Sequence, residues 1–291
     1  MAAAEEPKTE PSVFQPRLHH LYPVILSLAV TGILGFPISN PNNPVPQAQV
    51  TPFQGNGLGS ASLNALVFVV ALGASATVMF LLIKRGRMKF IRSLIKVAVL
   101  VVSFAVAFWY AASILFILPN SPSDPLATII LLGVSAGTSL AVALTIFRKT
   151  KKYQLVGITL ISALTGIFLG YSIGPVTALV LVGALVIYDI VAVFRGPVGK
   201  LAKSIEEGDL PGAVFTQGDL TIGMGDMVFY SLVATTALVY FGGILSFFGA
   251  AVGILAGTFL GFKALSRYEM FPGLPFSLLF GVAGMLVASF L

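Results

Sequence analysis

Apolar runs long enough to cross a lipid bilayer recur along almost the whole chain. A spanning helix needs about 20 consecutive apolar residues to cross a hydrocarbon core about 30 Å thick. Of the 291 residues, 57% are hydrophobic and only 10% are charged. We therefore expect an all-α polytopic membrane protein with nine transmembrane helices. The expected spans are 21–39, 61–83, 95–118, 126–147, 154–172, 174–194, 220–241, 243–263 and 272–291.

The chain divides into a polar tail and one membrane domain. Residues 1–20 carry several charges and prolines, which is typical of a mobile tail. Residues 21–291 are expected to form a single nine-helix domain. The connections at 172–175 and 241–243 are very short, so the spans that they join should form antiparallel hairpins.

The basic residues predict the orientation of the bundle. All 17 lysines and arginines lie in the N-terminal tail, in the even-numbered connections or at the span ends beside them, and the odd-numbered connections carry none. Because cationic segments stay in the cytoplasm, the N-terminus should be cytoplasmic and the C-terminus outside the cell membrane. A cleaved signal peptide is the alternative interpretation of the first span. The formal charge of +6 fits contact with anionic lipid headgroups and gives no reason to expect nucleic acid.

The chain has no cysteine, and both histidines precede the first span. No thiolate is therefore available as a nucleophile or a metal ligand, and no imidazole lies within the membrane to bind zinc or to activate a serine. This argues against serine-type and zinc-type intramembrane proteolysis. We expect no metal and no organic cofactor.

Two aspartates, Asp189 and Asp226, are the only carboxylates inside the long apolar spans, and they lie in consecutive spans. An aspartate at the centre of a spanning helix costs about 2.5 to 3.5 kcal/mol, so such a residue is usually partnered and functional. Asp189 precedes Arg195 by six residues, and Asp226 follows Asp219 by seven. With a helical rise of about 1.5 Å per residue, both should lie roughly 9 to 10 Å below the same membrane face.

The residues around the two acids favour a close approach of backbones. Asp226 ends the sequence Gly-Met-Gly-Asp, and its two glycines would let a neighbouring helix approach and would weaken the local helix. A proline-rich segment opens the last span on the same side of the membrane and is suited to a first helical turn. The candidate site thus comprises Asp189 and Asp226 as catalytic residues, with Tyr188, Gly223, Gly225, Pro272, Gly273, Leu274 and Pro275 as supporting or substrate-binding residues.

These motifs resemble those of the presenilin and signal-peptide-peptidase family of intramembrane aspartyl proteases. That family has nine spans, a Tyr-Asp pair in the sixth, Gly-x-Gly-Asp in the seventh and Pro-Ala-Leu at the ninth. Tyr188-Asp189 and Gly223 to Asp226 match, whereas Gly273 stands in place of the family alanine. The charge bias resembles that of presenilins, and the chain is similar to a short, prokaryote-type homologue. Because the sixth connection is short, the protein should work without being cleaved.

The resemblance implies an aspartic endopeptidase that cuts transmembrane segments of other proteins. Two carboxylates at close range cannot both ionise cheaply, so they should share one proton and titrate in two separate steps. One aspartate would then activate water while the other donates a hydrogen bond to the scissile carbonyl. The family also implies strand-like backbone near Pro272 and in the sixth connection, which would pair with unwound substrate. An assembly of several identical chains is compatible with the sequence.

Two other functions remain open from the sequence. An ion-coupled or proton-coupled transporter also uses buried acids and broken helices, although its site usually lies at the midplane of the membrane. An enzyme like the type IV prepilin peptidases also has Gly-x-Gly-Asp, but it has fewer spans. For each acid taken alone, a structural role is the plainer alternative.

Overall fold

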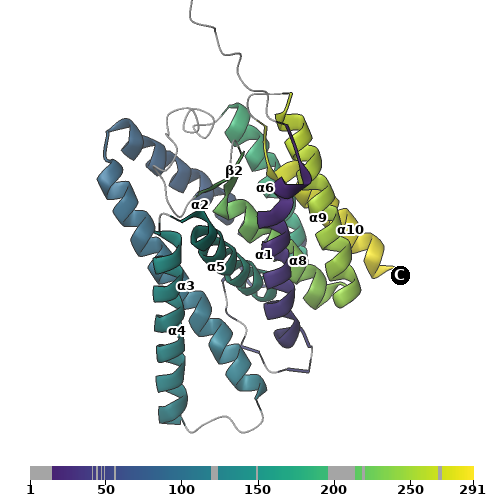
Figure 1. The fold of residues 1–291 in the computed structure, drawn as a ribbon. Helices are drawn as coiled ribbons and strands as arrows, with labels where there is room; N and C mark the ends of the chain where they lie inside the picture. The colour runs from purple at the N-terminus through teal and green to yellow at the C-terminus, as the bar shows by residue number, and fades with distance from the viewer. Residues whose placement is uncertain are drawn as a thin grey trace, which may run out of the picture.

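The computed structural model describes residues 15–40, 42–43, 45–46, 48, 50–55, 57–118, 124–148, 150–195, 214–217, 220–267 and 271–291. Nine α-helices occupy these described residues, together with one two-stranded sheet (Figure 1). The helices are α1 (Tyr22–Gly35), α2 (Leu58–Lys84), α3 (Met88–Ile117), α4 (Asp124–Ile146), α5 (Lys151–Ser172), α6 (Pro175–Phe194), α8 (Met224–Tyr240), α9 (Ile244–Leu265) and α10 (Leu274–Ser289). The strands are β1 (Val214–Gln217) and β2 (Leu220–Gly223), and two 3-10 turns, Leu18–Leu21 and Phe36–Ile38, flank α1.

The predicted all-α polytopic fold with nine helices is confirmed. Within the described residues, seven helices are long and apolar enough to cross a membrane, and α8 and α10 are shorter apolar helices of 17 and 16 residues. Helix α3 begins at Met88, before the expected 95, because the long stems of its basic residues carry their charges outward along the helix. The tail ends earlier than predicted, since a 3-10 turn starts at Leu18. Residues 1–14 of the predicted tail lie outside the described residues.

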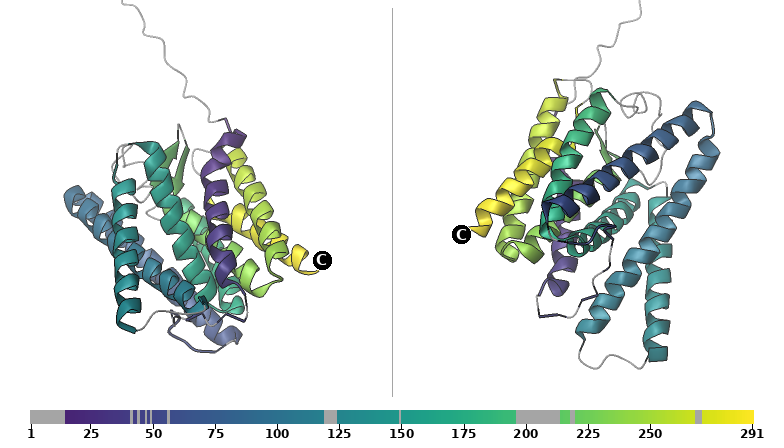
Figure 2. Two further views of the ribbon diagram at one scale, coloured as in Figure 1. Left: turned by 60° about the horizontal axis from the view of Figure 1, so that its bottom comes forward. Right: turned by 180° about the vertical axis from the view of Figure 1, so that it is seen from behind.

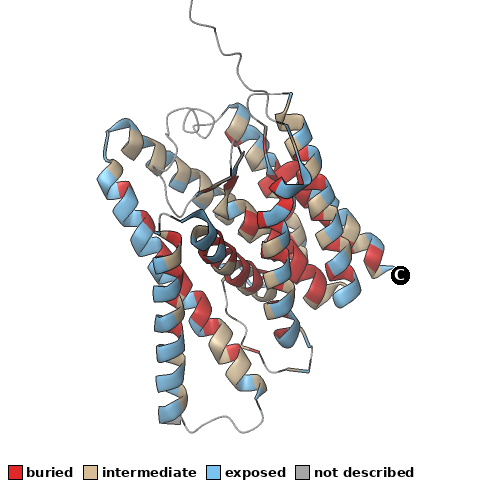
Figure 3. Cartoon of the chain, viewed as in Figure 1, coloured by how far each residue is buried: buried red, intermediate tan, exposed pale blue. Residues whose placement is uncertain are grey.

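Helices α5 and α8 lie at the centre of the bundle. Helix α8 packs along α5, α9 along α10, α3 along α4, and α2 along α6. Helices α2, α3 and α4 stand on one side, with α1, α9 and α10 on the other (Figures 1 and 2). Buried residues concentrate in α5 and α8, whereas the outer helices expose apolar side chains (Figure 3). An apolar outer surface is the form that a protein surrounded by lipid requires.

Glycines bring the central helices into backbone contact. A Cβ placed at Gly166 of α5 would lie 2.7 Å from the backbone oxygen of Val228 and 2.9 Å from the nitrogen of Leu232, both on α8. A Cβ at Gly257 of α9 would likewise meet the backbone of Phe276 on α10. Small residues permit such close approach between helices in membranes. Tight glycine packing therefore marks the α5–α8 and α9–α10 contacts, and Gly157 of α5 packs equally closely against α4.

The predicted helix over 220–241 is wrong in its first turn. Residues Leu220–Gly223 form strand β2, which pairs antiparallel with β1 and places Val214 opposite Gly223. Phe215 and Ile222 face each other in this pairing and are both buried, which anchors the hairpin to the bundle. The chain thus enters α8 from an extended strand. Most of the sixth connection, 196–213, and residues 218–219 lie outside the described residues.

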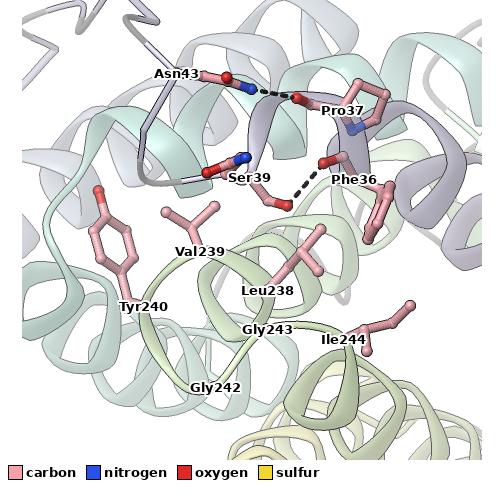
Figure 4. Close-up of a pocket in the computed structure, with 11 residues that line it drawn as sticks. Phe36, Pro37, Ser39, Asn43, Leu238, Val239, Tyr240, Gly242, Gly243 and Ile244 are labelled. Carbon is pink, nitrogen blue, oxygen red and sulfur yellow. Dashed lines mark hydrogen bonds between the residues drawn. The ribbon is translucent and has the colours of Figure 1, made fainter.

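One cavity lies far from both aspartates, at the other end of α8. It has a volume of ≈570 Å³ and is bounded by the end of α1, the end of α8 and the start of α9 (Figure 4). Gly242 and Gly243 form the turn below it with φ of 104° and 73°, values that glycine adopts readily. Among the described residues that line it, Tyr240 is the one with a titratable side chain. This cavity therefore lacks the acid pair that hydrolysis would need.

Candidate active site

Asp189 lies near the carboxyl end of α6. This helix begins with Pro175 in its first turn, where proline leaves no backbone donor unsatisfied, and continues as an apolar helix to Phe194. The Asp189 carboxylate accepts a hydrogen bond from the backbone N–H of Leu274, with an Oδ2 to N distance of 2.9 Å, and a second from the N–H of Gly273. Both donors belong to the start of α10. Asp189 is therefore held by backbone amides of another helix.

Asp226 lies in the first turn of α8, three residues after the N-cap residue Gly223. Its carboxylate accepts a hydrogen bond from the backbone N–H of Gly223, which is the reciprocal half of a capping box. An acid in this position also interacts favourably with the positive end of the helix dipole. The predicted depth of Asp226 rested on a helix from 219 onward, so that reasoning is wrong because 220–223 are extended.

The first residues of α10 bring the two acids together. Besides binding Asp189, Gly273 presents its Cα to Asp226, and a Cβ built there would lie 3.4 Å from Asp226 Oδ2. The two carboxylates interact electrostatically. Residues that are 37 positions apart in the sequence thus share one short backbone segment, Gly273 to Leu274.

A cavity of ≈130 Å³ opens beside Asp226, which is enough space for at least one water molecule. Its polar side chains include Asp226, Tyr230, Thr258 and Thr221 of β2, and apolar residues of α1, β2 and α9 complete its walls. The surroundings of Asp226 are therefore partly polar rather than purely hydrocarbon. Water could reach this carboxylate without entering lipid.

The other predicted site residues differ in how they lie. Pro272 and Pro275 are buried and flank the Gly273–Leu274 segment. Tyr188 turns toward α2, where its ring lies 3.6 Å from the position of a Cβ on Gly73. The prediction that Gly225 is a spacer between helices is wrong, because Gly225 is exposed and a Cβ there would meet nothing within 4 Å. A role for Tyr188 and Gly225 in substrate binding stays a prediction.

Three buried hydroxyl groups near the acids were not found from the sequence. Tyr230, Thr258 and Ser277 come from α8, α9 and α10, and they are 2%, 4% and 0% exposed. Ser277 Oγ donates a hydrogen bond to the Tyr230 hydroxyl, at 3.1 Å, and Thr258 also hydrogen-bonds that hydroxyl. The sequence feature that could have identified Tyr230 as a neighbour of the acid is its position one helical turn after Asp226.

Among the described residues there is no group of three or more histidine, cysteine, aspartate or glutamate side chains that could hold a metal ion. The chemistry available at the site is therefore that of two carboxylates, backbone amides and hydroxyl groups.

A sequence profile of the presenilin family matches residues 18–211, which is most of the membrane domain and includes Asp189. The chain belongs to the presenilin family. Presenilin-B of Dictyostelium discoideum is 33% identical over 117 residues, which are 36% of this chain and 24% of that protein. The match thus spans about a quarter of the length of the curated relative. The family profile ends before Asp226. The Gly-x-Gly-Asp motif of the seventh span and the segment at 272–274 before the ninth are therefore supported by their own residues and not by the profile.

Two solved structures of a presenilin family intramembrane aspartate protease, from C222 and P2 crystals, have the same fold. The first has a TM-score of 0.63 and 20% identity, and it covers 92% of this chain and 98% of its own. The second has a TM-score of 0.60 and 23% identity, and it covers 94% of this chain and 97% of its own. The presenilin fold is therefore present over nearly the full length.

Proposed function

We propose that this presenilin family member is an intramembrane aspartic endopeptidase in which Asp189 and Asp226 form the catalytic pair. The observation that carries the proposal is that Asp189 accepts a hydrogen bond from Leu274 while Asp226 lies beside Gly273, the residue that precedes Leu274. Family membership and the similarity to solved intramembrane aspartate proteases support the same activity.

The chemistry follows from two acids that share one proton. Two carboxylates at short distance in a medium of low dielectric constant cannot both ionise cheaply, so the working form carries one proton. The ionised aspartate removes a proton from water, and the resulting hydroxyl attacks the peptide carbonyl. The protonated aspartate donates its proton to the carbonyl oxygen, so a neutral gem-diol forms. As the gem-diol collapses, the other aspartate, now protonated, gives its proton to the amide nitrogen, and the C–N bond breaks to release the amine and a new carboxyl group. Turnover should therefore have a bell-shaped dependence on pH.

The substrates in this proposal are single transmembrane segments of other proteins. A helix hides its peptide bonds, so the segment must unwind near the site, and its freed backbone groups need hydrogen-bonding partners inside the membrane. Strand β2 leads directly into α8, which carries Asp226, and strand β1 pairs with β2. Within the described residues the other edge of β1 has no paired strand. By resemblance to the family, this edge would bind the unwound segment as an added strand.

The test is hydrolysis by purified protein in lipid nanodiscs. Single-span peptides are incubated in water enriched in ¹⁸O, and the products are sequenced by mass spectrometry. We expect two fragments whose new boundary lies within or beside the apolar segment, with ¹⁸O in the new carboxyl group. Intact peptides, together with proton or solute movement across liposomes that contain the protein, would favour the transporter alternative.

A further inference from the structure

A cluster of three buried hydroxyl groups links the helices that build the site. Tyr230 of α8 lies between Thr258 of α9 and Ser277 of α10. Tyr230 and Thr258 also line the cavity into which Asp226 opens. Buried hydroxyl groups stay in an apolar bundle at low cost only when they are hydrogen-bonded. Each of these three has such a partner.

Ser277 connects this cluster to the backbone that meets both acids. Its Oγ lies 2.8 Å from the backbone oxygen of Gly273, 3.2 Å from that of Leu274 and 3.1 Å from the Tyr230 hydroxyl. The amides of Gly273 and Leu274 in turn hydrogen-bond Asp189. The single hydroxyl hydrogen of Ser277 is thus shared between Tyr230 and the first turn of α10, and the amide of Leu274 in that turn binds Asp189.

Tyr230 is also tied to the other acid by its position. It follows Asp226 by four residues, so the two side chains lie one turn apart on the same face of α8. A shift of Tyr230 along α8 would need the helix itself to move. Through Ser277, Tyr230 thus connects the first turn of α10 with the helix that carries Asp226.

The contact between α9 and α10 is close and mostly apolar. Gly249, Gly253 and Gly257 of α9 meet the backbone of α10, and Ile254 of α9 packs against Gly281 of α10. Directional hydrogen bonds from Ser277 add a polar constraint at the first turn of α10, one turn before Gly281.

We propose that Tyr230, acting through Ser277, is a positioning residue that holds the Gly273–Leu274 turn against the two aspartates. The inference rests on the proposed peptidase function. Tyr230 acts on the reaction by placing the backbone amide that binds Asp189, although its side chain also lines the cavity beside Asp226. Thr258 of α9 also interacts with the Tyr230 hydroxyl.

The test compares Tyr230→Phe, Ser277→Ala and the double variant with the unaltered protein in nanodiscs. Each single variant should lower kcat by between about 10-fold and about 100-fold and leave KM within about twofold, because misplacement of the acids slows chemistry more than binding. The double variant should lose no more than either single variant, since both break the same hydrogen bond.

The matched control is Tyr240→Phe at the other end of α8. The Tyr240 hydroxyl donates to the backbone oxygen of Tyr171 at 2.8 Å, so this change also removes a partly buried tyrosine hydrogen bond. Its kcat should stay within about twofold of the unaltered protein, since it lies far from the acids. The unfolding midpoint of every variant is measured in parallel. If Tyr230→Phe does not insert, Ser277→Ala is judged by the same criteria.

Three results would overturn the proposal: an unchanged kcat in Ser277→Ala or Tyr230→Phe, losses that multiply in the double variant, or an equal loss in Tyr240→Phe. Failure of the peptidase function itself would look different. In that case the unaltered protein would leave the peptide intact, as Asp226→Asn does.

Discussion

At the scale of single residues, Gly273 occupies the most exacting position in the site. Its backbone has φ of −79° and ψ of −32°, which any residue can adopt, so conformation does not demand glycine there. The limit is space, because a Cβ would lie 3.4 Å from Asp226 Oδ2. That distance is an ordinary contact for one methyl group, whereas the γ-methyl groups of a branched side chain would be brought against the carboxylate.

We therefore predict that Gly273→Ala retains cleavage within about twofold, whereas Gly273→Val loses more than about tenfold, since small misplacements of reacting groups cost rate steeply. The measurement is the initial rate of peptide cleavage by each purified variant, with the unfolding midpoint as a control for folding. Equal losses in both variants would show that contact with Asp226 does not set the limit at this position.

Much of the site follows from the sequence, and the reasons are specific to residues. Asp189, Asp226 and the segment at 272–275 stand out because an acid or a proline in an apolar run needs an explanation. The sequence did not reveal that the amide of Leu274 binds Asp189, because that hydrogen bond depends on how α10 docks. For the same reason the sequence suggested that Gly225 is a spacer between helices, although a Cβ at this position would meet nothing within 4 Å.

At the scale of helices and strands, the α5–α8 contact holds the bundle together beneath Asp226. Gly166 has Ser231, Val228 and Leu232 of α8 directly against it, and two of the three nearest atoms belong to the backbone. A backbone atom cannot move aside as the end of a flexible side chain can. Any side chain at position 166 must therefore push the two helices apart.

Gly166→Ala should lower the free energy of unfolding by about 1 to 3 kcal/mol through overpacking, and cleavage should fall with it. Gly183→Ala is the matched control, because a Cβ at Gly183 of α6 would meet nothing within 4 Å. Reversible unfolding in mixed micelles compares the two. A Gly183→Ala variant as unstable as Gly166→Ala would mean that the loss does not come from helix contact.

The helices were predictable to within several residues, whereas the strands were not. Apolar runs of about 20 residues have few other stable forms in a membrane. Leu220 to Gly223 continue such a run in the sequence, and only their pairing with Val214 to Gln217 makes them a strand. Pairing between segments is a property of the folded chain, so α8 was predicted too long at its start.

At the scale of the whole molecule, the orientation in the membrane is a proposal that rests on the one-sided charge distribution. All basic residues lie in the tail, in the even-numbered connections or at the span ends beside them, so the first connection should face outward and the fourth should face the cytoplasm. The two aspartates would then act near the cytoplasmic face.

Single cysteines can test this orientation on the native background, since the chain has none. Asn40→Cys in the first connection should react with an impermeant maleimide in intact cells, and Thr150→Cys in the fourth only after permeabilisation. Both positions are exposed, so access is not limited by packing. The opposite pattern would reverse the orientation.

The central claim is that Asp189 and Asp226 work as one catalytic pair, and the most direct measurement is the cleavage rate of the two asparagine variants and their double. Asparagine keeps size and polarity but cannot titrate, so Asp189→Asn and Asp226→Asn should each lose at least about 1,000-fold in kcat, as groups acting as a unit do. The double variant should then be no slower than either one. Substantial cleavage by either single variant, in a preparation free of other proteases, would contradict the account.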